Sequence, residues 1–370
     1  MKEVLLRSRG VSACFGLLGL MNLLPLAVPI PVFVQLLVSS SCCVYIGCGF
    51  ASKVAEHPSG EVIKAKKTSD EETVTTQDAL RFPLTASAVL FGLYVLYKYV
   101  SPALVNFLLT LQFCLLTVVS ISNLVVPYLP FSEEWKAPLC KIKTPKWMKD
   151  TLDITDIEPS KASLLTNLIC ALPVVFYYFT KFWVLNNIFG VLFSIVAIKS
   201  MNLGSFKVGF ILLWLLFFYD IFWVYGTDVM VTVAKNLDIP IKLLFPYIND
   251  AGESKFSMLG LGDIVIPGIF VSICLKYDVD KAIKNKAHKL KDFKLEYFNL
   301  CFIGYVLGIV ATFSALLIFN HAQPALLFLV PSCTLPVLAK GFLSKELDEL
   351  KNYETDGDHK THEEKEKTQQ

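Results

Sequence analysis

Long runs of apolar residues alternate with short polar segments along most of the chain. Each run approaches the roughly 20 residues that a helix needs to cross the hydrocarbon core of a bilayer. We therefore predict nine transmembrane spans, at residues 31–50, 82–101, 103–126, 162–181, 185–200, 208–227, 256–275, 297–319 and 322–340.

These spans are predicted to be helical. Every backbone N–H and C=O group inside lipid needs a partner, which only helices and closed barrels provide. The runs lack the alternation of a membrane β-barrel. A hydrophobic content of 54% and a mean hydropathy of +0.55 agree with many spans. The predicted fold class is an all-α membrane protein, a polytopic bundle of nine transmembrane helices.

An additional apolar segment, Val11 to Ile30, precedes the first span. Lys2, Arg7 and Arg9 lie before it, as in a signal peptide, although no clear A-x-A cleavage site follows. A cleaved signal peptide, an additional helix and an extension of the first span all remain open. The resulting division is an N-terminal apolar segment, an N-terminal helical half, a catalytic membrane region and a charged tail, at residues 1–30, 31–200, 201–341 and 342–370.

The charges of the loops predict the orientation of the chain. Nine spans place the lysine-rich loops 51–81, 127–161 and 276–296 on one side of the membrane, together with the tail. Positively charged loops favour the cytosol. We therefore expect a cytosolic C-terminus and a luminal start of the chain after residue 30. A basic N-terminal stretch on the luminal side would break this rule, which disfavours a simple extension of the first span.

The luminal loop at residues 228–255 is unusually apolar. Its stretches 229–233 and 239–245 are rich in β-prone residues. It is interpreted either as an interfacial segment or as an extended flap. The tail, in contrast, is dense in charged residues and is predicted to be solvated and disordered.

Two acidic residues lie inside apolar runs. Asp220 belongs to the run at 208–227, and Asp263 to the run at 256–275. A charged carboxylate at the centre of a bilayer costs about 2.5–3.5 kcal/mol, so such residues are rare and usually functional. Two carboxyl groups held close together cannot both ionise cheaply, and the pair shares one proton. The ionised group can then activate a water molecule while the protonated group donates to a carbonyl oxygen, which is the chemistry of an aspartic protease.

The residues beside these acids fit such a site. Gly260 and Gly262, on either side of Leu261, are expected to let a neighbouring helix approach Asp263 closely. Pro267 removes the N–H that would bond to the carbonyl of residue 263 and weakens the helix there. Tyr219 is expected either to donate a hydrogen bond within the site or to pack on a neighbouring side chain.

A turn is predicted where the last span begins, at Gln323-Pro324-Ala325-Leu326. Pro324 cannot continue a helix from upstream and favours an extended conformation at Gln323. Extended backbone at this position can pair with an unwound substrate strand.

The motifs Tyr219-Asp220, Gly260-Leu261-Gly262-Asp263 and Gln323-Pro324-Ala325-Leu326 together resemble the YD, GxGD and PAL motifs of intramembrane aspartyl proteases. The chain is similar to the signal peptide peptidase branch of that family, related to presenilin, from about residue 78 to about residue 341.

The resemblance implies that Asp220 and Asp263 are the catalytic pair, supported by Tyr219, Gly260, Leu261 and Gly262. Gln323, Pro324, Ala325 and Leu326 would bind the substrate. It also implies nine helices in the endoplasmic reticulum membrane and cleavage of type II-oriented signal-peptide remnants. The expected partners are such helices, the lipid bilayer, further copies of the chain and quality-control proteins.

The residues alone leave two other functions open. A proton-coupled transporter or channel could use the two acids as a relay, although no second half of the chain repeats a broken helix. A membrane scaffold could bind helices without cutting them. The ten cysteines form neither a disulfide framework nor a metal-ligand spacing, so we predict no cofactor and no metal. The net charge of +2 gives no indication of a nucleic-acid partner.

Overall fold

The structure is a computed structural model of the whole chain. The residues that it describes are 2–5, 8–28, 30–56, 62–64, 72–126, 129, 132–139, 159–227, 229–237, 239–248, 254–284, 294–319 and 323–355.

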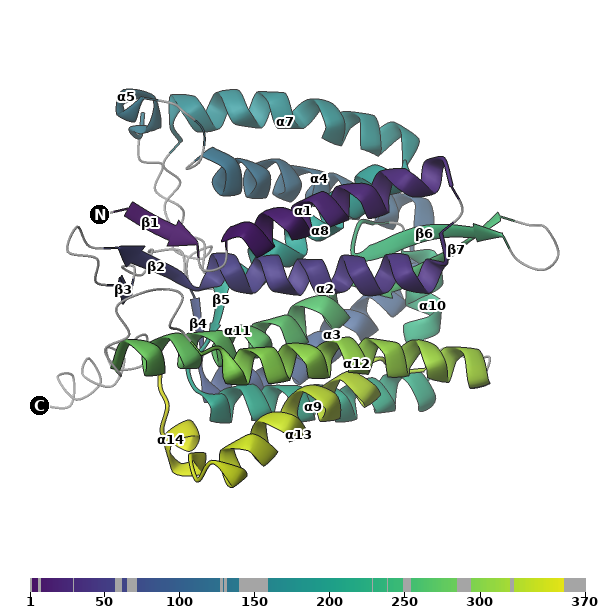
Figure 1. Cartoon of the computed structure of the whole chain (residues 1–370). Helices are drawn as coiled ribbons and strands as arrows, with labels where there is room; N and C mark the ends of the chain where they lie inside the picture. The colour runs from purple at the N-terminus through teal and green to yellow at the C-terminus, as the bar shows by residue number, and fades with distance from the viewer. Residues whose placement is uncertain are drawn as a thin grey trace, which may run out of the picture.

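Long helices packed side by side form the body of the molecule, with short strands at its two ends (Figure 1). The helices are α1 (Ser8–Leu23), α2 (Val32–Ala51), α3 (Thr76–Tyr99), α4 (Pro102–Val125), α5 (Glu133–Lys136), α7 (Lys161–Thr180), α8 (Trp183–Ser200), α9 (Phe206–Tyr225), α10 (Val229–Asn236), α11 (Gly262–Lys284), α12 (Glu296–Phe319), α13 (Leu326–Leu343) and α14 (Leu347–Lys351). The strands are β1 (Lys2–Leu5), β2 (Lys53–Glu56), β3 (Val62–Lys64), β4 (Glu72–Val74), β5 (Met201–Leu203), β6 (Lys242–Ile248) and β7 (Ser254–Gly260).

Side-chain caps fix where several helices begin. Thr75 and Asp78 form a capping box at the start of α3, in which each side chain bonds to the other residue's backbone N–H. Ser160 and Ser163 do the same for α7. The hydroxyl of Ser205 accepts from the N–H of Val208 at the start of α9. These bonds satisfy N–H groups that the first turn of a helix leaves without partners.

Helix α11 is the centre of the bundle. It packs against α2, α8, α9, α12 and α13, and nearly all its residues from Ile264 to Val279 are buried or partly buried. Eight helices in the described part of the chain are long and apolar enough to cross a membrane, and all eight correspond to predicted spans. The remaining prediction, 256–275, corresponds to α11, which carries Asp263, Lys276 and Asp278. Other helices surround this helix, so it tolerates these charges. The predicted fold class, an all-α polytopic membrane protein, is confirmed.

The predicted start of one span and the expected conformation of one loop stretch differ from the structure. The first residues of the predicted span 256–275 belong to strand β7, and the helix starts at Gly262. The stretch 229–233 is helical, as part of α10, although its residues are β-prone. Packing of Val233 against α3 and α4 overrides that preference. The second β-prone stretch is largely strand: β6 pairs with β7 in an antiparallel hairpin.

The N-terminal segment forms a helix of its own. Pro25 lies in a short 3₁₀ turn and Pro31 caps α2, so the chain breaks between α1 and α2. Strand β1 pairs antiparallel with β2, which follows α2 directly, so α1 and α2 form a hairpin of helices. The interpretation of this segment as an extension of the first span is therefore wrong. Strands β1–β3 and the β6–β7 hairpin lie at opposite ends of the bundle (Figure 1).

A C-terminal strap, which we define as residues 346–355, packs on the bundle where the sequence predicts a solvated tail. Leu350 and Tyr353 are buried, and the Tyr353 ring contacts Phe206 of α9 and Tyr277 of α11. The backbone N–H of Thr355 donates to the carbonyl of Gly204 at 2.8 Å, just before α9. Apolar residues spaced by three within a charged sequence anchor this segment. The prediction of disorder from residue 342 is therefore wrong for the strap.

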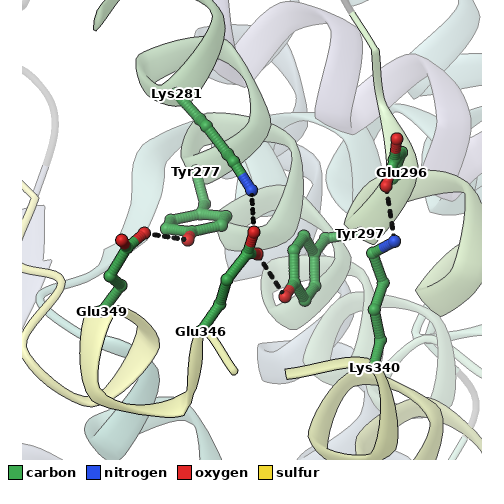
Figure 2. A network of polar contacts seen from close by, with 7 residues as sticks. All are labelled: Tyr277, Lys281, Glu296, Tyr297, Lys340, Glu346 and Glu349. Atoms are coloured by element: carbon green, nitrogen blue, oxygen red, sulfur yellow. Dashed lines mark hydrogen bonds and ion pairs between the residues drawn. The ribbon is translucent and has the colours of Figure 1, made fainter. Parts of the chain in front are cut away.

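Polar contacts join the strap to helices α11 and α12 (Figure 2). Glu346 accepts hydrogen bonds from Lys281 of α11 and from the Tyr297 hydroxyl of α12, the latter at 2.8 Å. Glu349 accepts from the Tyr277 hydroxyl at 3.3 Å. Burial raises the pKa of Glu346, but the hydrogen bonds from Lys281 and Tyr297 outweigh it and hold the pKa below its ordinary value of 4.5.

Candidate active site

Asp220 and Asp263 come together between α9 and α11. Asp220 lies in the second half of α9 and is only 7% exposed. Asp263 lies in the first turn of α11 and is partly buried. The two helices pack against each other, and the carboxylates lie within electrostatic reach of one another. The structure thus brings the two acids of separate apolar runs together inside the bundle, as the sequence predicts.

The turn before α13 reaches this pair through its backbone. The N–H of Leu326 donates to Oδ2 of Asp220 at 3.2 Å. Helix α13 begins at Leu326, and the preceding Pro324 and Ala325 accept the first helical hydrogen bonds. Gln323 accepts a hydrogen bond from the Tyr225 hydroxyl at the end of α9. All three predicted motifs therefore meet at one site.

The glycines before Asp263 do not have the role that the sequence predicts for them. A methyl group built on Gly260 would lie 3.4 Å from Oδ2 of Asp263, and one on Gly262 would meet only Ile266 of its own helix, at 3.9 Å. Neither glycine admits a neighbouring helix, so that prediction is wrong. They leave open space in front of the acid instead. Leu261 is buried between them, and its N–H donates to the carbonyl of Ile241 at 2.9 Å.

Tyr219 packs on another side chain rather than within a hydrogen-bond network. Its ring contacts that of Trp223, with centroids 6.3 Å apart. The indole N–H of Trp223 in turn donates to the Ser87 hydroxyl of α3 at 3.2 Å. Of the two interpretations of Tyr219, the structure supports packing, and the hydrogen bond of Trp223 joins α9 to α3.

Sequence reasoning missed the contribution of α8. Asn186 and Asn187 of this helix are fully buried and bond to the backbone of β6. Gly190, one turn later, lies under Leu243 and Leu261. The signal was present, because two adjacent amides inside an apolar run are as unusual as a lone acid.

Carboxyl oxygens and backbone groups are what the described residues contribute to the site. Within the described ranges, no group of three or more His, Cys, Asp and Glu side chains gathers where it could hold a metal ion. The site has two carboxyl groups within electrostatic reach of each other, a backbone N–H that holds one of them, and open space beside the other. Such a pair can pass one proton between its members while it activates a water molecule.

Comparison with known proteins covers most of the chain. Residues 66–357 match the family model described as signal peptide peptidase. The chain is 38% identical over 302 residues to signal peptide peptidase of Homo sapiens, which covers 79% of this chain and 77% of that protein. It is 42% identical over 213 residues to intramembrane protease 2 of Caenorhabditis elegans, covering 56% of this chain and 46% of that protein. A probable intramembrane protease of Saccharomyces cerevisiae is 35% identical over 222 residues, or 57% of this chain and 38% of its own length.

The family match, the high identity over most of both chains and the many apolar helices agree with one another. This multi-pass membrane protein belongs to the signal peptide peptidase family of intramembrane proteases.

Proposed function

We propose that the protein is an aspartic endopeptidase that hydrolyses peptide bonds inside membrane-spanning helices, with Asp220 and Asp263 as its catalytic pair. One observation carries the proposal: the three separated motifs converge, with Asp220 beside Asp263 and held by the N–H of Leu326. A pair of acids built into the bundle core, with space left beside one of them, suits acid–base catalysis.

In the proposed reaction one carboxyl group is ionised and the other protonated. The ionised group takes a proton from water, and the water oxygen attacks the carbonyl carbon of the substrate. The protonated group donates to the carbonyl oxygen. When the tetrahedral intermediate collapses, the C–N bond breaks and the leaving nitrogen takes a proton, which leaves a new carboxyl terminus and a new amine. The hydrogen bond from Leu326 to Asp220 holds that carboxyl group in position throughout.

The substrate must be unwound before it can be cut, and β7 offers a place for the unwound segment. This strand ends at Gly260, three residues before Asp263. Phe256 and Met258 of β7 are exposed. An extended substrate segment paired with the outer edge of β7 would run toward the acids, by strand addition. The turn formed by Gln323, Pro324, Ala325 and Leu326, whose N–H at Leu326 is bonded to Asp220, is proposed to bind the substrate beside the acids.

The proposed substrates are type II-oriented signal-peptide remnants in the endoplasmic reticulum membrane. This follows from the names of the human and mouse relatives, which are called signal peptide peptidases. The lysine-rich loops support a cytosolic C-terminus, and the position of the β6–β7 hairpin opposite β1–β3 supports a luminal hairpin (Figure 1). Assembly with further copies of the chain or with quality-control proteins belongs to the same proposal.

The test is cleavage of a radiolabelled signal-peptide-like helix by the purified, detergent-solubilised full chain. Wild type, Asp220→Ala and Asp263→Ala are compared, with Asp78→Asn at the start of α3 as an acid outside the pair. We expect cleavage by wild type and Asp78→Asn only. Cleavage by either alanine variant would refute the catalytic pair. Absence of cleavage by all four folded proteins would refute the peptidase proposal and make proton flux in proteoliposomes the next assay.

A further inference from the structure

Two adjacent asparagines, Asn186 and Asn187, lie near the start of the apolar helix α8. They are 2% and 0% exposed, respectively. A buried amide without hydrogen-bond partners costs several kcal/mol in a medium that offers none. Both side chains therefore need partners inside the protein, and both find them on a strand rather than on a helix.

Asn187 bonds to the backbone of one residue of β6 in both directions. Its Nδ2 donates to the carbonyl of Leu244 at 2.8 Å, and its Oδ1 accepts from the N–H of Leu244 at 2.7 Å. A residue on a neighbouring antiparallel strand would make the same pair of bonds. Asn186 adds a third bond, from its Nδ2 to the carbonyl of Lys242 at 2.7 Å, and its Oδ1 accepts from the Tyr177 hydroxyl.

The register of the hairpin shows which edge these amides occupy. Leu244 lies opposite Met258 of β7, and Lys242 lies opposite Gly260. Because the N–H and C=O of Leu244 both bond to Asn187, they point away from β7. Backbone groups two residues apart share a direction, which agrees with the bond from Asn186 to Lys242. The two amides thus occupy the outer edge of β6. The other outer edge of the hairpin, that of β7, remains for a further strand.

The same contacts continue to the catalytic pair. The N–H of Leu261 donates to the carbonyl of Ile241, one residue before β6, at 2.9 Å. The side chains of Leu243 and Leu261 both lie over Gly190, where an added methyl group would come within 3.1 Å and 3.3 Å of them. Two residues separate Leu261 from Asp263. The position of β6 on α8 therefore sets the position of Asp263.

We propose that Asn187 is a positioning residue for cleavage. Its side-chain amide takes the place of a third strand on β6. The hairpin then holds Asp263 at a fixed position along the substrate, and the edge of β7 is the edge that remains for the substrate. The proposal rests on the proposed function, and it explains how the peptide bond that is cut is selected. If the hairpin loses its hydrogen bonds to Asn187, the β7 edge and Asp263 move relative to the rest of the site. One substrate is then cut at several neighbouring bonds.

The test compares Asn187→Leu, which is close in size but has no polar group, with Ser194→Ala. Ser194 is fully buried two turns further along α8, and its hydroxyl bonds only within that helix, to the carbonyl of Gly190. Three quantities are measured on the full chain in detergent: kcat and KM for a signal-peptide-like helix, the product lengths by mass spectrometry, and hydrogen exchange of the peptide containing Leu244.

For Asn187→Leu we expect faster exchange at Leu244, several product lengths, and a kcat lowered roughly 10- to 100-fold, because small misplacement of reacting groups has effects of this size. Ser194→Ala should match wild type in all three. A single wild-type product formed at the wild-type kcat by Asn187→Leu would overturn the proposal. If that variant does not fold, Asn187→Ala is judged by the same criteria. If wild type cuts no helix, the proposed function fails. Independently of that result, unchanged hydrogen exchange at Leu244 in Asn187→Leu would overturn the proposed role of Asn187.

Discussion

At the scale of single residues, the site is defined by what surrounds each acid. Asp220 is held by a backbone N–H from another helix, whereas Asp263 begins its own helix next to residues without side chains. One acid is therefore fixed and the other is approachable. This asymmetry suits a pair in which one member holds its position while a substrate comes close to the other.

The space beside Asp263 yields the first prediction. A Cβ atom at position 262 meets only Ile266 of its own helix, so we expect Gly262→Leu to fold and insert normally, yet to fill the space in front of the acid. We expect it to abolish cleavage. Gly92→Leu, on the exposed face of α3 where a side chain also meets nothing, should keep wild-type activity. Equal activity of both variants would show that substrate does not approach Asp263 from the side of Gly262.

At the scale of elements, α12 and α13 depend on close backbone contact. A methyl group on Gly304 would lie 2.1 Å from the backbone carbonyl oxygen of Ser332, and one on Gly308 would lie 3.1 Å from Cα of Leu329. These glycines, four residues apart, let the helix that carries the Leu326 N–H approach α12. No flexible side-chain end can move aside at Gly304, because the obstacle is backbone.

The second prediction follows from that contact. Gly304→Ala should lower the free energy of unfolding by about 1–3 kcal/mol, the usual range for overpacking. Thermal unfolding in detergent measures this as a lower Tm. Gly19→Ala, at a position on α1 where the methyl group meets nothing, is the matched control and should not lower Tm. A Tm for Gly304→Ala equal to that of wild type would contradict this packing.

The third prediction concerns pH and the strap. The pKa of Glu346 in the folded protein is below 4.5, so its ionised form stabilises the folded state above that value. This contribution is lost as the pH falls below 4.5 and through the folded-state pKa. Glu346→Gln should therefore have a lower Tm than wild type at pH 6, and the difference should shrink at pH 3.5. Asp348→Asn, which removes a nearby charge in α14, should show no such pattern. A pH-independent difference for Glu346→Gln would contradict this assignment.

The elements also show how much of the fold sequence patterns can predict. Apolar length predicts the spans, because crossing a bilayer needs a fixed number of apolar residues. It finds α11 but misplaces its start, because residues 256–260 are apolar and yet belong to strand β7. The β-prone residues at 229–233 are a separate case, because they form part of helix α10, where packing decides between helix and strand. The pairing of β6 with α8 could not be predicted, because it depends on two amides whose partners lie more than 50 residues away.

At the scale of the whole molecule, the C-terminal strap connects the helices of both acids. Tyr353 contacts α9 and α11 through its ring, and its hydroxyl donates to Asp280 of α11 at 2.7 Å. The hydroxyl of Thr355 donates to the carbonyl of Leu203, ahead of α9, at 3.0 Å. A segment that the sequence presents as a charged tail therefore ties the bundle together at the end away from the hairpin.

The fourth prediction separates the strap from the residues after it. A chain that ends after Thr355 keeps every contact of the strap described above and should retain wild-type Tm and cleavage. A chain that ends after Lys345 loses all of them and should have a lower Tm and reduced cleavage. The two truncations are compared in the same detergent. Equal behaviour would show that the strap contributes nothing to the arrangement of α9 and α11.

The fifth prediction addresses the central claim, that Asp220 and Asp263 use water to cut a helix. The most direct measurement is cleavage of a signal-peptide-like helix in water labelled with oxygen-18, followed by mass spectrometry of the products. Wild type should produce fragments with one labelled oxygen at the new carboxyl terminus, from a bond inside the apolar segment. Asp220→Asn and Asp263→Asn, which keep the size of each side chain, should produce none. Labelled fragments from either variant, or wild-type fragments without label, would contradict the claim.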